Sequence, residues 1–290
     1  MKKIVILLAM LIGNGILLHA EDQPILVTPQ WLKEHLSDPK LVLLQPNNMK
    51  LDYDNEHIAG ARYVWPEWLT PNSPEGNYNV PDLGKANAIL QQLGINNDSH
   101  VVICHVHGEV SLTARIFLTL EHLGLKGQVS YVNGGLNAWK KEGYPVTKDL
   151  PVVKKGNFKA KPVNLIVDKN YVANTLKSPD GLVVDARMKR FYDGEPTGNP
   201  RDGHITGAVN IQYTDLINPI NKFKSLDSLQ TYFTPVIPSK EKKLVTYCFI
   251  GQTASVVYMA GRLLGYNITL YDGSIQEWSR LNDLPMEKTK

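Results

Sequence analysis

The chain has 290 residues, the length of about two ordinary domains. Charged residues make up 20% of it and hydrophobic residues 43%, a globular composition that excludes a disordered or fibrous protein. Lysine and arginine (31) nearly balance aspartate and glutamate (28), so charge gives no reason to expect a nucleic-acid partner. Two cysteines cannot form a disulfide framework.

Residues 1–20 have the layout of a secretory signal peptide. Lys2 and Lys3 precede an apolar run over 4–12, and a second short apolar run leads to Ala20 and an acidic, polar segment. We expect cleavage after Ala20 and a periplasmic or secreted protein with no stable membrane association. The alternatives are an uncut membrane anchor and a buried first strand or helix.

Four blocks of sequence occur twice in the same order, which indicates a duplication. The chain is therefore predicted to hold two similar domains, residues 24–140 and 163–288, joined by a proline- and lysine-rich surface linker at 141–162. The paired blocks are 26–44 with 166–184, 57–61 with 204–208, 101–104 with 244–247, and 133–139 with 272–278.

The hydrophobic pattern of the second repeat alternates strand and helix. Apolar runs at 182–184, 244–247 and 268–271 predict buried strands. The apolar spacing over 253–264 predicts a helix that Gly265 ends. Strand, helix and strand at this separation imply parallel pairing, so the fold class is α/β in both repeats.

The segment 248–253 follows the strand at 244–247 and precedes the helix. A loop in this place directs backbone N–H groups at anything held above the helix N-terminus, and Gly251 lets it turn tightly. These N–H groups and the positive helix end lower the pKa of a cysteine, so Cys248 is a candidate nucleophile. The alternative is a buried, inert thiol, which is what we expect of Cys104.

This loop, the two His-Ile-x-Gly-Ala blocks and the closing segment 271–278 resemble the rhodanese family. The duplication resembles its two-domain members, the thiosulfate and 3-mercaptopyruvate sulfurtransferases, over nearly all of residues 24–286. The resemblance implies two tandem rhodanese-like domains, each a five-stranded parallel sheet with helices on both faces. It also implies that Cys248 takes a sulfane sulfur as a persulfide and passes it to a thiophilic acceptor, cyanide or a thiol.

The two repeats differ at this loop. Their alignment puts His105 where Cys248 stands, and Glu109 would repel an anion. We predict that the first domain is non-catalytic and supports or covers the site of the second. His57 and His204 begin matching turns, and a feature kept in the inactive half is expected to be structural.

The anionic end of a donor requires cations. In the mercaptopyruvate-handling relatives two arginines bind substrate, and the resemblance matches them to Arg190 and Arg201. The alternative for each is a surface ion pair. Arg187 is expected instead to tie its loop to an acid such as Asp185.

The cysteine loop fits neither subtype of the family, since it lacks the basic residues of one and the Gly-Ser-Gly run of the other. We expect thiosulfate as donor and a small thiophilic acceptor, with 3-mercaptopyruvate, or a persulfide relay for a partner protein, as alternatives. No cofactor or metal is expected, because no Gly-Lys phosphate motif or metal-ligand spacing occurs. The protein is expected to be a monomer. The loop residues expected to bind substrate are Phe249, Ile250, Gly251, Gln252 and Thr253.

Overall fold

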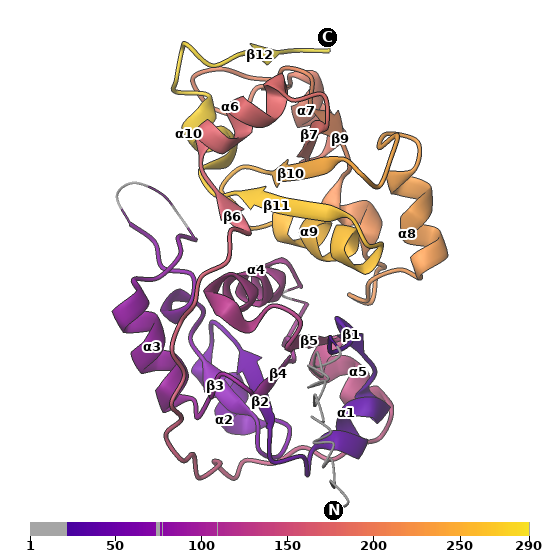
Figure 1. Ribbon diagram of the computed structural model, residues 1–290. Coiled ribbons are helices and arrows are strands. Elements are labelled where there is room, and N and C mark those ends of the chain that lie inside the picture. The colour runs from indigo at the N-terminus through magenta and orange to yellow at the C-terminus, as the bar shows by residue number, and fades with distance from the viewer. Residues whose placement is uncertain (1–21, 74–75, 77, 109, 290) are drawn as a thin grey trace, which may run out of the picture.

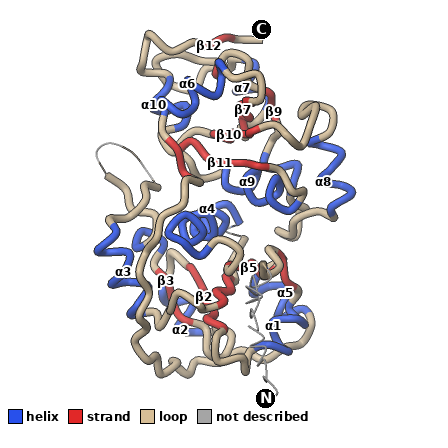
Figure 2. Tube along the Cα trace, in the orientation of Figure 1, coloured by secondary structure: helices blue, strands red, loops and turns tan. Residues whose placement is uncertain are grey.

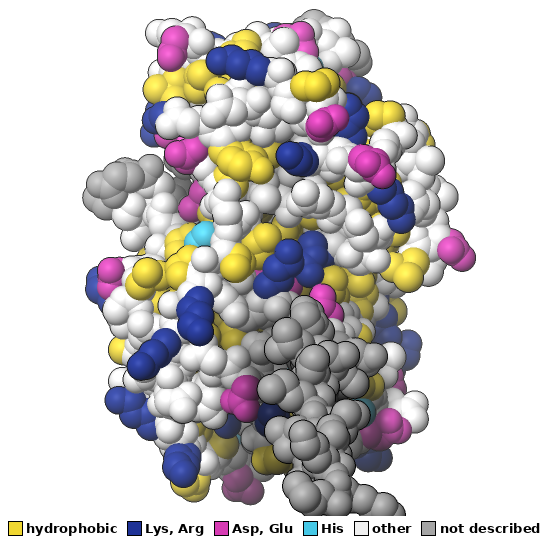
Figure 3. Space-filling model, viewed as in Figure 1, with side chains coloured by type: hydrophobic (Ala, Val, Ile, Leu, Met, Phe, Trp, Pro, Cys, Tyr) yellow, Lys and Arg dark blue, Asp and Glu magenta, His cyan; other side chains and the backbone are white. Residues whose placement is uncertain are grey.

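The computed structural model describes residues 22–73, 76, 78–108 and 110–289. Two domains lie one above the other and are connected once, by an extended segment (Figure 1). The predicted signal peptide at 1–20 lies outside the described residues. Within those residues, no helix is long and apolar enough to cross a bilayer. Basic and acidic side chains are interspersed over the face shown in Figure 3.

The first domain is built on a five-stranded parallel sheet with the order β1-β5-β4-β2-β3. The strands are β1 (Leu26–Val27), β2 (Leu41–Pro46), β3 (Arg62–Val64), β4 (His100–Ile103) and β5 (Val129–Val132). The helices are α1 (Pro29–His35), α2 (Lys50–Asn55), α3 (Leu83–Gln92), α4 (Val110–Leu120) and α5 (Gly135–Lys141), with a 3₁₀ turn η1 (Pro66–Trp68) and a π-helical turn η2 (Glu121–Leu125).

The second domain repeats this topology, with a parallel sheet of order β6-β11-β10-β7-β9 and a small antiparallel pair, β12-β8. The strands are β6 (Ile166–Val167), β7 (Gly181–Asp185), β8 (His204–Ile205), β9 (Val209–Asn210), β10 (Lys243–Tyr247), β11 (Asn267–Tyr271) and β12 (Met286–Glu287). The helices are α6 (Lys169–Lys177), α7 (Lys189–Asp193), α8 (Leu226–Phe233), α9 (Ala254–Leu263) and α10 (Ser274–Trp278), with a 3₁₀ turn η3 (Tyr213–Leu216). The predicted α/β class, duplication and parallel pairing are confirmed.

The repeated blocks encode repeated local devices. Thr28 caps α1 by accepting from the Trp31 N–H at 3.0 Å, and Asp168 caps α6 by accepting from the Tyr171 N–H at 2.9 Å. Each cap satisfies one of the N–H groups that the first turn of a helix leaves without a partner. Both copies therefore start their first helix directly after their first strand.

The two histidines of the repeated blocks are structural, as expected. His57 stacks on Tyr53 and its Nδ1 lies 2.7 Å from the Tyr53 carbonyl oxygen. His204 stacks on Tyr192 with the same 2.7 Å contact. Each pair joins a helix of its domain, α2 or α7, to the turn that leads back into the sheet.

Helices cover both faces of each sheet. In the first domain α1, α2 and α5 pack on one face and α3 and α4 on the other. In the second domain α6 and α10 pack on one face and α8 and α9 on the other. Helices α4 and α9 lie against each other between the two sheets (Figure 1), so a single hydrophobic core runs from one domain into the other.

The predicted linker forms neither helix nor strand over 148–163 and follows the first domain to the second (Figure 2). It is fastened as it goes, since the Gly156 N–H donates to the Gln91 carbonyl at 2.8 Å and the Phe158 ring is wholly buried. Most of its other side chains are exposed or half-buried. The linker therefore lies on the surface but is anchored to the first domain.

Candidate active site

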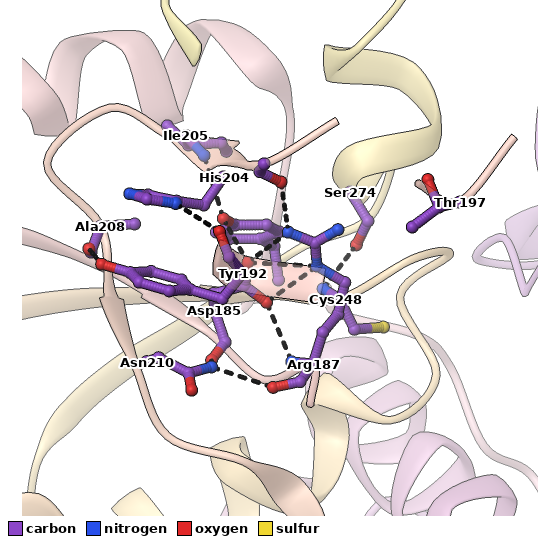
Figure 4. Close-up of polar contacts among 12 residues, drawn as sticks. Asp185, Arg187, Tyr192, Thr197, His204, Ile205, Ala208, Asn210, Cys248 and Ser274 are labelled. Atoms are coloured by element: carbon purple, nitrogen blue, oxygen red, sulfur yellow. Dashed lines mark hydrogen bonds and ion pairs between the residues drawn. The ribbon is translucent and has the colours of Figure 1, made fainter. Parts of the chain in front are cut away.

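Cys248 stands where the sequence predicts it, between the end of β10 and the start of α9. Its N–H donates to Ser274 Oγ at 3.1 Å (Figure 4), and its carbonyl accepts from the Ile275 N–H at 3.1 Å. The side chain is 1% exposed. The thiol is thus held at the end of a central strand and shielded from bulk water.

The loop after Cys248 offers hydrogen-bond donors. Its carbonyl groups at 249, 252 and 253 accept from backbone N–H groups of α9 or α10, each at 3.1 Å. The five N–H groups of residues 249–253 meet no acceptor within the part of the chain that the structure describes. A run of such N–H groups before a helix favours negative charge, here a thiolate, a persulfide or an anionic donor.

A buried ionic network lies next to the cysteine. Arg187 donates through Nε and Nη2 to the Asp185 carboxylate, at 3.0 and 2.6 Å (Figure 4). Tyr247 donates its hydroxyl to the same carboxylate at 2.7 Å. Burial disfavours the charged guanidinium, but Asp185 outweighs it and raises the pKa of Arg187. The predicted Arg187–Asp185 tie is confirmed. The guanidinium also lies 5.1 Å from the Phe249 ring centre, so it places a fixed positive charge beside the loop.

The two arginines predicted to bind substrate have different surroundings. Arg190, on α7, is 57% exposed, and its Nη1 lies 3.5 Å from Glu195 Oε1. Arg201 donates to four backbone carbonyls after α10, at 2.6–3.0 Å, and so uses four of its five N–H donors. The prediction that Arg201 binds substrate is not supported, because its donors already fasten the turn over 278–284.

The remaining loop side chains point to several neighbours. Phe249 packs edge-on against Phe191 of α7, and Gln252 reaches Ser111 of the first domain at 3.3 Å. Ile250 lines a cleft of about 500 Å³ between the domains. Thr253 makes no side-chain cap of α9. The loop is therefore partly open to the interdomain cleft and partly closed by the first domain.

The equivalent loop of the first domain has no thiol at the corresponding place. The Leu136 N–H donates to the His105 carbonyl at 2.9 Å, just as Ile275 does to Cys248, which confirms the predicted alignment. His105 is buried, and burial lowers its pKa to about 4. Cys104 is wholly buried in the core, as expected, and burial raises its pKa. The predicted role of Glu109 falls on a residue outside the described part of the chain.

Sequence reasoning missed one residue that contacts the loop. Arg115, on α4 of the first domain, has no exposed surface. Its Nη1 lies 2.7 Å from Asp272 Oδ1 and 3.2 Å from the Gly251 carbonyl oxygen. The signal available in the sequence is an arginine inside an otherwise apolar helical pattern over 110–120.

Comparison with known proteins identifies the family. The family model described as "Rhodanese-like domain" matches residues 28–142 and 168–281. The chain belongs to the rhodanese family. The first matched range ends two residues beyond the domain predicted at 24–140, and the second lies within 163–288 and carries Cys248 and its loop.

The relatives carry more than one activity name. The chain is 32% identical to "Sulfur carrier protein TtuD" of Thermus thermophilus, over 91% of this chain and 96% of that protein. It is 27% identical to "Thiosulfate sulfurtransferase" of Azotobacter vinelandii, over 91% and 97%. The crystal structure of SseA from Escherichia coli, described under 3-mercaptopyruvate sulfotransferases, is 27% identical with a TM-score of 0.76, over 87% of this chain and 99% of that one. The predicted fold, a pair of tandem rhodanese domains, is confirmed.

Proposed function

We propose that this rhodanese-family sulfurtransferase takes a sulfane sulfur from thiosulfate onto Cys248 and passes it to a thiophilic acceptor, cyanide or a thiol. The observation that carries the proposal is the cysteine loop. A thiol at the end of a buried strand is followed by five N–H groups with no acceptor in the described residues. Such a loop stabilises negative charge on sulfur and on the group that leaves it.

The proposed reaction has two sulfur transfers. The Cys248 thiolate attacks the outer sulfur of thiosulfate, a new S–S bond forms, and sulfite leaves with the electron pair of the broken bond. The acceptor then attacks the outer sulfur of the persulfide. With cyanide the products are thiocyanate and the regenerated thiolate. No net oxidation or reduction of the enzyme accompanies the cycle.

The surroundings of the loop support thiosulfate over a carboxylate donor. An arginine pair is the arrangement expected for a carboxylate, but Arg201 is committed to backbone carbonyls. A compact oxyanion can instead be held by the N–H groups of 249–253, with the buried Arg187 charge beside them. The exposed Arg190 remains a candidate for guiding the anion toward the site.

A persulfide relay is the second candidate, and the sulfur-carrier name of the Thermus thermophilus relative favours it. A relay holds the persulfide until a partner protein takes it. It differs from an enzyme in one respect, namely that small acceptors are not turned over. 3-Mercaptopyruvate is the alternative small donor, as in the name under which the SseA structure is described.

The deciding experiment uses the full chain and its Cys248→Ser variant, with Cys104→Ser as the matched control. Each is assayed with thiosulfate plus cyanide and with 3-mercaptopyruvate plus a thiol. We expect thiosulfate turnover in the wild type and in Cys104→Ser, and none in Cys248→Ser. Faster turnover of 3-mercaptopyruvate would reassign the donor. A stable persulfide at Cys248 without turnover of either donor would support the relay.

We also propose that the protein is exported, because residues 1–20 have the pattern of a signal peptide, and that it is a monomer. The intact mass of the protein recovered from its producing cells measures the first. A chain that begins at Glu21 is expected, and retention of the apolar segment would contradict export by cleavage. Light scattering of the purified protein measures the second, with the mass of one chain expected.

A further inference from the structure

Arg115 carries a positive charge from the first domain into the cysteine loop of the second. Its side chain, on α4, has no exposed surface and points to the second domain. Nη1 is 2.7 Å from Asp272 Oδ1 and 3.2 Å from the Gly251 carbonyl oxygen, and Nη2 donates to the Tyr78 carbonyl. One guanidinium therefore joins the cysteine loop, the turn after β11 and a loop of the first domain.

The Gly251 carbonyl is the contact that matters for chemistry. Other carbonyls of the loop accept from backbone N–H groups of the helices that follow, whereas the partners of this one are side chains, Arg115 and the Ser255 hydroxyl at 3.4 Å. Gly251 has φ of +77°, a conformation that glycine adopts easily and leaves easily. Among the described residues, the hydrogen bonds that hold the peptide between 251 and 252 through its carbonyl come from side chains.

We propose that Arg115 is a positioning residue for the sulfur transfer. It holds the Gly251 carbonyl toward the first domain, so that the N–H groups of 249–253, and not a carbonyl dipole, face the sulfur. This inference rests on the proposed function, because it supposes that Cys248 carries negative charge. It also gives the first domain a definite share in the reaction, although that domain has no nucleophile.

Comparison with the second domain indicates that packing alone does not require a charged side chain at position 115. The residue that stands as far before Gly265 as Arg115 stands before Gly124 is Val256, on α9. Val256 is also wholly buried. An apolar side chain therefore satisfies the same place in the helix that faces the first domain, where there is no cysteine loop to hold.

The test compares Arg115→Met and Arg115→Lys with a matched control, Arg262→Met. Arg262 lies on α9 and pairs with Glu121 of the first domain at 2.7 Å, so it crosses the same interface without touching the cysteine loop. The full chain is used in a Cys104→Ser background. Three quantities are measured for each: the rate of Cys248 alkylation by iodoacetamide against pH, kcat and KM for thiosulfate, and the midpoint of thermal unfolding.

We expect Arg115→Met to lower the alkylation rate and kcat by about 10- to 100-fold, the range for a hydrogen bond to a charged group, with a smaller change in KM. Arg115→Lys keeps the charge but not the fork, and a loss of about 3- to 10-fold is expected. Arg262→Met should lower the unfolding midpoint while changing the alkylation rate by less than about 3-fold.

Two results would overturn the inference. One is an Arg115→Met protein whose Cys248 reacts at the wild-type rate. The other is an equal loss in Arg262→Met, which would show that any damage to the interface suffices. If Arg115→Met does not fold, a wild-type rate in Arg115→Lys overturns it. The alkylation readout needs no sulfur donor, so a wild type that turns over no thiosulfate would refute the proposed function separately.

Discussion

The two domains share a backbone arrangement and differ in the side chains at the cysteine loop. His105 and Cys248 occupy the same place, each with its carbonyl bonded to the start of the last helix of its sheet. His105 is neutral and its Nδ1 lies 2.6 Å from the Tyr131 hydroxyl, so its ring is bonded within its own domain. Cys248 is followed by a loop whose N–H groups meet no acceptor among the described residues. The two copies therefore share this backbone contact and differ in the side chain at the position that carries the nucleophile.

The supporting layer differs in the same sense. In the first domain the Ile58 N–H donates to the neutral Gln45 side chain at 3.2 Å. In the second domain the Ile205 N–H donates to the Tyr247 hydroxyl at 3.1 Å, and that hydroxyl is bonded to Asp185. A hydrogen bond to a neutral side chain in the first domain corresponds to a charged network in the second. The charged version is the one that brings an arginine beside a thiol.

The largest effect is expected when the nucleophile is moved to the first domain. The double variant Cys248→Ser, His105→Cys places the thiol in the first domain. We expect it to be at least about 10³-fold less active than wild type in the thiosulfate assay, no better than Cys248→Ser alone, because neither the open loop nor the arginine accompanies the thiol. Recovery of activity would mean that the backbone shared by the two domains is enough for catalysis.

The next largest effect is expected from the charged network. Arg187→Met leaves the Asp185 carboxylate buried without its cation, which costs about 3–5 kcal/mol of unfolding free energy. The control is Asn47→Ala, at the matching place of the first domain, where loss of one hydrogen bond to the Asp52 carboxylate and one from the Met49 N–H costs about 1–2 kcal/mol. Denaturant unfolding of both variants measures the difference. Equal losses of unfolding free energy would show that the ion pair contributes no more than the hydrogen bonds of the control.

His105 makes the first domain sensitive to acid. Its pKa is about 4 in the folded protein, below the ordinary 6.5, so the unfolded chain binds more protons between these values. The contribution of neutral His105 to the free energy of unfolding is therefore fully present above pH 6.5. It falls as the pH drops toward 4, by about 3 kcal/mol at most. In His105→Gln this part of the pH dependence should vanish. Unfolding at pH 7 and pH 4.5 in both proteins tests it, and an unchanged dependence contradicts it.

The smallest effects separate the two predicted arginines. Arg201→Met should cost about 2 kcal/mol of stability, because four carbonyls lose their donor, with little change in the KM for thiosulfate. Arg190→Met should change stability by less than about 0.5 kcal/mol, because the side chain is exposed. A rise in its KM for thiosulfate would assign Arg190 to donor capture. An unchanged KM would leave the loop N–H groups as the anion site.

The sequence predicts this fold well because its signals are local. Apolar runs locate β7, β10 and β11 within one residue at each end, and the repeat reveals the duplication. Cys248 is found because its loop joins a buried strand to a helix in an unbroken stretch of chain. The Arg187–Asp185 tie is found because the two residues are neighbours in sequence.

The failures concern contacts between distant segments. Arg201 matches a family motif, yet its partners lie about 80 residues further on, in a turn whose carbonyls no motif announces. Arg115 sits in the other domain, and its contacts exist only once α4 and α9 have packed. A linear pattern identifies residue types suited to a task, but it does not say which of them tertiary structure has already engaged.

The continuous core between the domains has a consequence for how the protein unfolds. Because α4 and α9 bury their apolar faces against each other, neither half can leave without exposing that surface to water. The two halves are thus thermodynamically dependent on each other, and a single cooperative transition is expected in place of the two independent ones that a repeat alone suggests. The two copies therefore form one folding unit, and unfolding of either copy is expected to unfold the other.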